Sequence, residues 1–115
     1  MRLLVVFTLV LLAFKTPQTI TGRWETIQPG GNTLGMIFKP DNHFEGYVNK
    51  KPFVSGTYIF SHNTIILNGN GCIDMPGKYR INFLKNIGSI LWEVISDSCA
   101  ARKKGLDNVV FSRIQ

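Results

Sequence analysis

Turn-forming residues interrupt this chain at short intervals, and their spacing limits the elements that it can form. Gly and Asn tolerate left-handed backbone angles and Pro fixes φ, so clusters of these residues mark turns. The stretches between the clusters are too short for long helices over most of the chain. The clusters lie at 29–32, 40–43, 49–52, 61–63, 68–77 and 86–88.

The runs between these turns have the composition of β-strands. The clearest is 78–84, in which Tyr79, Ile81 and Phe83 alternate with polar residues, the period of a strand with one buried face. In 89–95, Ile90, Trp92 and Val94 alternate with a second apolar set, Leu91 and Ile95. The sequence does not decide which of the two sets faces inward. The eight expected strands are 22–27, 34–39, 44–48, 53–60, 64–67, 78–84, 89–95 and 109–113.

One segment near the end of the chain departs from the strand pattern. Asp97 is a suitable N-cap, residues 98–104 permit a helix with cations in its last turn, and Gly105 offers a left-handed stop. We therefore expect two helical turns immediately before the last strand.

The short connections between strands decide the expected architecture. Parallel neighbours need a crossover of a dozen or more residues, so these strands should pair antiparallel. The sequence predicts an all-β fold, a small eight-stranded antiparallel up-and-down barrel with one short helix before the last strand. A barrel of eight strands is filled by its own side chains or holds one small ligand. A two-sheet sandwich is the alternative architecture.

The first residues have the pattern of an export signal. Arg2 is followed by an apolar run over 3–14, whereas a membrane-spanning helix needs roughly 20 apolar residues. We expect a signal peptide over 1–16, a barrel domain over 20–115, and a secreted or periplasmic protein with no stable membrane span. A buried strand is the alternative for the apolar run, and the absence of a following cysteine argues against a lipoprotein anchor.

The charge is basic but dispersed. The whole chain has a formal net charge of +6 at pH 7. Removal of residues 1–16 removes Arg2 and Lys15 and leaves a net charge of +4. Basic residues cluster only at 50–51 and 102–104, without the interleaved aromatics of nucleic-acid binders. We expect both clusters to be solvated surface and expect no nucleic-acid partner.

Cys72 and Cys99 are the only cysteines, and an even pair in an exported chain can oxidise. A bridge would stabilise a small domain by about 3 to 4 kcal/mol in the chain-entropy model. Two cysteines cannot form a zinc site without histidines, and His43 and His62 lie far away in turn-like sequence. We favour a disulfide over free thiols and expect no metal or other cofactor.

Several of these residues together resemble a known family. Gly22-Arg-Trp24 is similar to the Gly-x-Trp signature of lipocalins, and Arg113 matches the last-strand arginine that packs over that tryptophan. The resemblance implies a lipocalin-like, calycin-type barrel, although this chain is shorter and lacks the long helix of typical lipocalins. Further similarity to short exported bacterial lipocalin-like proteins of unassigned function lies at 56–58, Cys72, 77–79, Leu91 and 97–102.

Inward-facing aromatic residues supply the predicted ligand site. Apolar pockets with a few polar groups are the usual sites for small molecules. The same side chains could instead fill a solid core, which is the stronger interpretation for a barrel this small. The predicted lining residues are Met36, Phe38, Phe44, Tyr58, Phe60, Tyr79, Phe83 and Phe111.

The charged residues are predicted to have structural roles. Trp24 and Arg113 should form a cation–π contact that closes one end of the barrel. Asp97 should cap the helix or pair with Arg102. The acidic residues show no paired spacing that hydrolysis would need, and no Ser-His-Asp order or phosphate-binding loop is present. We therefore expect a protein that is not an enzyme.

Two functions remain open at this point. The first is an exported barrel that binds a small apolar or amphipathic ligand. The alternative is a solid-core interaction or structural module that contacts a protein or glycan through loops such as 29–33 and 49–52. Exposed aromatic residues on those loops would favour the alternative, and Phe53 is the only candidate.

Overall fold

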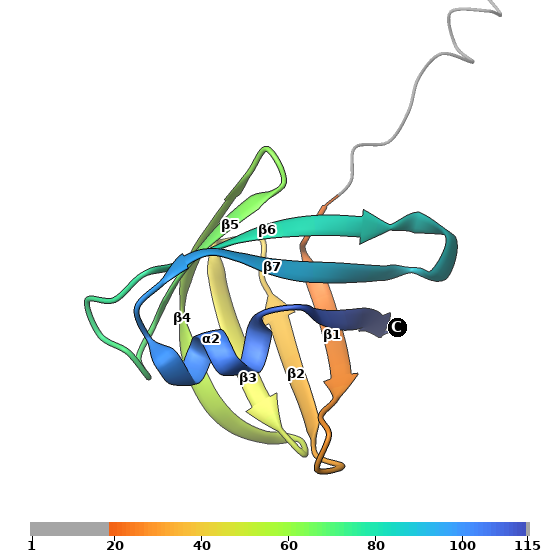
Figure 1. Ribbon diagram of the computed structural model, residues 1–115, viewed down its shortest axis with the longest axis horizontal. Coiled ribbons are helices and arrows are strands. Elements are labelled where there is room, and N and C mark those ends of the chain that lie inside the picture. The colour runs from red at the N-terminus through yellow and green to blue at the C-terminus, as the bar shows by residue number, and fades with distance from the viewer. Residues whose placement is uncertain (1–18, 115) are drawn as a thin grey trace, which may run out of the picture.

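The computed structural model describes residues 19–114, and the expected signal peptide lies outside them. Its eight strands form one closed antiparallel barrel in which each strand pairs with its sequence neighbours and the last with the first (Figure 1). This confirms the predicted all-β barrel. The strands are β1 (Gly22–Ile27), β2 (Thr33–Phe38), β3 (His43–Val48), β4 (Lys51–Ser61), β5 (Thr64–Gly69), β6 (Gly77–Leu84), β7 (Ser89–Asp97) and β8 (Val109–Ile114).

Pairing with β6 decides which face of β7 is buried. Ile90 and Trp92 lie directly opposite Phe83 and Ile81 of β6. Direct partners in an antiparallel pair point to the same side of the sheet. The set that contains Trp92 therefore faces the core, which resolves the parity that the sequence left open.

The short helix α2 (Ala100–Leu106) lies between β7 and β8, as predicted, but both of its expected ends were wrong. Its N-cap is Cys99, because pairing opposite Gly77 draws Asp97 into β7 as the last residue of that strand. Gly105 lies inside the helix, which continues one residue further and so buries Leu106 in the core.

One end of the barrel, here called the closed end, is covered by the chain before β1. The Trp24 indole N–H donates to the Ile20 carbonyl at 2.8 Å, and Ile20 is itself buried. The Arg113 guanidinium lies 4.2 Å from the Trp24 ring centre and donates to the carbonyls of Thr21 and Thr19 at 2.9 and 3.0 Å. The predicted contact of Arg113 with Trp24 thus fastens residues 19–21 across this end.

Aromatic side chains fill the barrel next to the closed end. Phe38 packs against Tyr58 and Trp92 at centroid distances of 5.0 and 6.1 Å. Trp92 in turn contacts Tyr79 at 5.6 Å and Phe111 at 5.8 Å. Such edge-to-face, tilted and stacked pairs add to the free energy gained by burying the rings. This part of the interior is a solid core.

Candidate functional site

A cavity of about 510 Å³ lies at the other end of the barrel, here called the open end. This end carries the β1–β2, β3–β4 and β5–β6 connections and α2, whereas the β2–β3 and β4–β5 turns and the 3-10 helix η1 (Lys85–Ile87) lie at the closed end. Leu34, Val48 and Leu67 form part of an apolar wall, and Phe53 stands at the mouth. Gln28 and Arg102 contribute polar groups to the lining.

Two of the eight predicted lining residues, Met36 and Phe44, line this cavity. Phe60 and Phe83 instead pack against each other at 6.2 Å, near the ends of β4 and β6 that belong to the closed end. The barrel therefore has a solid half and a hollow half. The solid-core interpretation describes the first half, and the ligand-cavity interpretation describes the second. The remaining four, Phe38, Tyr58, Tyr79 and Phe111, lie in the aromatic core.

Small residues, rather than aromatic ones, form part of the cavity wall on β3 and β5. Gly46 follows Phe44 on the inward face of β3, and Gly69 follows Leu67 on the inward face of β5, and both glycines line the cavity. The Val54 side chain packs against both, since a Cβ atom added at Gly46 or Gly69 would lie 2.7 or 3.2 Å from a Val54 methyl group. The prediction considered aromatic side chains and so missed these small lining residues, which lie at inward positions near one end of two strands.

One face of α2 forms part of the cavity wall. Ala101, Gly105 and Leu106 lie on this face, together with Arg102. A Cβ atom added at Gly105 would meet no neighbouring group within 4 Å, so packing does not require glycine there. Glycine inside a helix costs about 1 kcal/mol relative to alanine. Its effect here is to leave open space beside the cavity.

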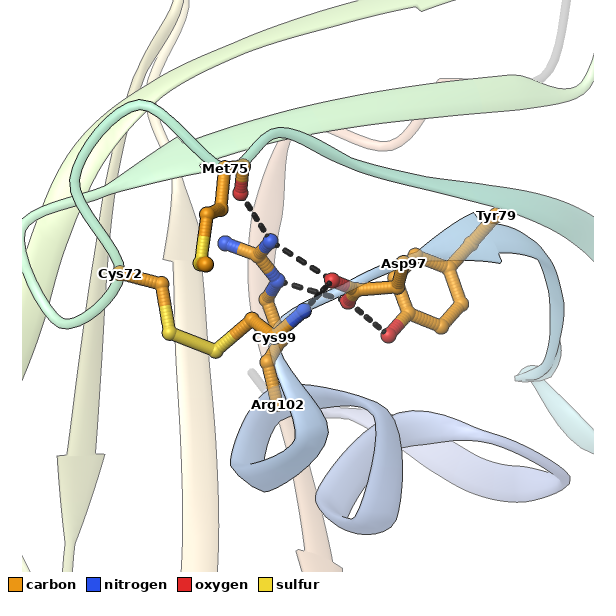
Figure 2. The surroundings of a disulfide bond; sticks show 6 residues. All are labelled: Cys72, Met75, Tyr79, Asp97, Cys99 and Arg102. Atoms are coloured by element: carbon orange, nitrogen blue, oxygen red, sulfur yellow. Dashed lines mark hydrogen bonds and ion pairs between the residues drawn. A yellow bond between two sulfur atoms is a disulfide. The ribbon is translucent and has the colours of Figure 1, made fainter.

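The disulfide between Cys72 and Cys99 fastens the edge of the cavity, and both cysteines contribute to the lining (Figure 2). It joins the β5–β6 loop to the start of α2, two segments that are 27 residues apart. This confirms the predicted disulfide. The bridge holds loop and helix in fixed positions on one side of the open end.

Beside the disulfide, the carboxylate of Asp97 accepts four hydrogen bonds (Figure 2). Arg102 Nε and the Tyr79 hydroxyl donate to its Oδ2 at 2.7 and 2.5 Å. Arg102 Nη2 and the Cys99 backbone N–H donate to its Oδ1 at 2.8 and 2.9 Å. Arg102 Nη2 also donates to the Met75 carbonyl, so this one cluster joins β6, β7, α2 and the β5–β6 loop.

The surroundings of Asp97 keep it ionised. Burial by itself would raise its pKa, but the hydrogen bonds from Arg102, Tyr79 and Cys99 outweigh burial and hold the pKa below its ordinary value. Burial and the adjacent carboxylate raise the pKa of Tyr79, which therefore stays a neutral donor. Asp97, Tyr79 and the Nε and Nη2 groups of Arg102 thus hold the open end together.

No family model, curated protein or solved structure matches the chain. Within residues 19–114, no group of three or more His, Cys, Asp and Glu side chains is placed to hold a metal ion. None of the described helices is long and apolar enough to cross a membrane. The geometry of the barrel and its cavity is therefore the basis for a functional assignment.

Proposed function

We propose that this protein is an exported lipocalin-like barrel that binds a small apolar or amphipathic ligand at its open end, without catalysis. The observation that carries the proposal is the cavity of about 510 Å³ with its largely apolar wall. Sites for small molecules are mostly apolar clefts of about 300 to 1,000 Å³ with a few polar groups. Gln28 and Arg102 would orient the polar end of an amphipathic ligand.

Two observations support the remaining parts of this proposal. The closed barrel with Arg113 packed over Trp24 agrees with the lipocalin resemblance, and the disulfide agrees with export to an oxidising compartment. A role without catalysis is supported by Asp97, since its carboxylate is taken up by four protein donors and a general base needs a free lone pair.

The first test is native mass spectrometry of the protein purified from its own host. A reproducible small adduct is the expected result. If the protein carries no adduct, and no apolar compound from the host extract binds to it on addition, ligand carriage is excluded and the barrel acts as an interaction or structural module.

A pair of variants in α2 tests whether the cavity is the binding site. Ala101 and its neighbour Ala100 are both exposed, but only Ala101 lines the cavity. Ala101→Trp should fill the mouth and abolish binding of N-phenylnaphthylamine, a neutral dye that fluoresces in apolar surroundings, while Ala100→Trp should bind it as the parent protein does. Equal binding by both variants would place the dye elsewhere and contradict the proposed site.

A further inference from the structure

We propose that the open end docks on an anionic lipid surface, mouth first. The contact surface, here called the rim, combines cationic and apolar side chains from three neighbouring connections around the cavity mouth. Docking of the rim does not depend on ligand carriage, so the two proposals can fail separately. The rim consists of Lys50, Lys51, Phe53, Ile73, Lys103 and Lys104.

A β-bulge presents Phe53 to solvent. In the pairing of β3 with β4, Gly46 lies opposite Val54 and Tyr47 opposite Pro52, which leaves Phe53 as an extra residue with no partner. Bulges re-aim side chains and occur at barrel rims. As a result the Phe53 side chain is 70 % exposed at the cavity mouth, a costly place for a phenyl ring unless something covers it.

Ile73 provides a second exposed apolar side chain at the same end. It is 74 % exposed and follows Cys72 in the β5–β6 loop. This loop is fastened beside β4, because Ser55 and Asn70 exchange two hydrogen bonds of 2.9 and 3.1 Å. The loop is therefore held next to the strand that carries Phe53, and the disulfide secures its other side.

The β3–β4 turn and the first residue of β4 carry two lysines, and the first of them, Lys50, is in a position that does not favour it. Asn49 and Lys50 have φ values of 50° and 70°, left-handed angles at which two-residue turns prefer Asn followed by Gly. Lys51 pairs with Val48, whose side chain lines the cavity, so Lys51 emerges on the inner face of the barrel at its edge. The chain thus places a cation at a strained position on the rim where glycine would fit better.

Helix α2 adds two more cations. Lys103 and Lys104 are exposed, whereas Ala101, Arg102 and Gly105 face the cavity. Among residues 19–114, none of the four rim lysines forms an ion pair.

Carboxylates offset only part of this positive charge. At the open end, Asp97 is taken up by Arg102, and Asp107 accepts a hydrogen bond from the Val94 backbone N–H at 2.9 Å. Asp74 is the exposed carboxylate on the β5–β6 loop. In the part of the chain that the structure describes, four unpaired lysines therefore face one exposed acidic group at the open end, and the surface around the mouth is positive.

The combination of unpaired lysines and exposed apolar side chains on the rim fits an anionic lipid surface. Lysines near a membrane surface are attracted to anionic headgroups, and apolar side chains beside them can enter the acyl boundary. A nucleic acid, or a protein surface made only of acidic groups, would engage the lysines but would leave Phe53 and Ile73 in water. At the closed end, by contrast, Lys39 pairs with Glu45 at 2.7 Å and His43 lies 3.3 Å from Asp41.

Site-specific fluorescence in the full chain tests the orientation. Trp24 and Trp92 are buried and give a constant background. Phe53→Trp should show a blue shift with vesicles of phosphatidylcholine and phosphatidylglycerol in equal parts, and none with phosphatidylcholine alone. Ile87→Trp is the matched control, since Ile87 is 67 % exposed at the closed end, and it should not shift. A shift in Ile87→Trp without one in Phe53→Trp would overturn the proposal.

Vesicle co-sedimentation tests the contribution of charge. Each lysine near an anionic surface adds about fivefold to affinity, so Lys50→Gln/Lys51→Gln and Lys103→Gln/Lys104→Gln should each bind mixed vesicles about 25-fold more weakly. Lys85→Gln at the closed end should bind like the parent, and binding by the parent should weaken as salt rises. Residues 1–18 are the same in all variants, so a difference in affinity between variants is caused by the substituted lysines. Parental affinity in both double variants, or equal binding to neutral vesicles, would refute docking through the rim.

Discussion

At the scale of single residues, Arg113 shows how one side chain can close a barrel. Its guanidinium stacks on Trp24 and donates to two carbonyls of the segment that crosses the closed end. Gly22 makes room for it, because a Cβ atom there would lie 2.6 Å from Arg113 Nη1 and the backbone has φ 131°. The Gly-x-Trp pattern and the last-strand arginine are thus parts of one contact.

We predict that Arg113→Lys destabilises the protein by about 1 to 2 kcal/mol, because an ammonium cannot stack as a plane and reach both carbonyls. Urea unfolding measures the change in free energy. Arg80→Lys, at an exposed position of β6, is the control and should change stability little. Equal effects of the two substitutions would show that the geometry of the guanidinium has no role.

The buried carboxylate of Asp97 should make the stability of the protein depend on pH. Its side chain is fully buried and its pKa is lowered in the folded protein, so its contribution to stability is complete above the ordinary pKa of 3.8 and is lost as pH falls through the folded value. Arg102→Met leaves this charge buried without its partner, which should cost about 3 to 5 kcal/mol at neutral pH.

Protonation of Asp97 removes the unpaired charge, so the difference between Arg102→Met and the parent should shrink as pH falls below about 4. Urea unfolding curves at neutral and acid pH measure it. A difference that stays constant with pH would mean that Arg102 stabilises the fold by packing alone.

At the scale of elements, the disulfide and α2 act together on the open end. The bridge closes a loop between positions separated by 27 residues, so Cys72→Ser/Cys99→Ser should lose about 3 to 4 kcal/mol. Thermal unfolding of the double variant and of the reduced parent, each compared with the oxidised parent, measures this loss. A loss seen only in the serine variant, and not on reduction, would assign the effect to the substitutions themselves.

Helix α2 can also be stabilised by a substitution at Gly105. Gly105→Ala should stabilise the protein by about 0.5 to 1 kcal/mol, since alanine favours the helix and its Cβ meets no neighbouring group. Urea unfolding tests this. Destabilisation would show that the space beside Gly105 is not open in solution.

At the scale of the whole molecule, the solid half of the barrel should carry more of the stability than the hollow half. Phe38 is enclosed by aromatic rings, so Phe38→Ala should cost about 3 to 5 kcal/mol. Leu34 borders the cavity, so Leu34→Ala enlarges an existing space and should cost less than half as much. Unfolding free energies of the two variants make the comparison, and equal losses would contradict the division into two halves.

Local sequence patterns predicted the strands and the helix well, because side-chain alternation and turn formation depend on neighbouring residues. Tyr79, Ile81 and Phe83 alternate on β6 as the period of a strand requires, and the turn residues marked where each strand ends. The helix ends were wrong because distant partners determine them. Pairing with Gly77 draws Asp97 into the sheet, and the core draws Leu106 into the helix.

The sequence by itself determined the order of eight strands, the place of the short helix and the pair of cysteines available for a bridge. These features could be predicted because turn formation and side-chain alternation depend on neighbouring residues. Only the tertiary structure decided which part of the interior is empty and what surrounds it. Gly46 on β3 and Gly69 on β5 are ordinary small residues until the barrel brings their inward faces to one end. An empty volume depends on how side chains from separate strands pack together, and closure of the barrel determines which strands meet there.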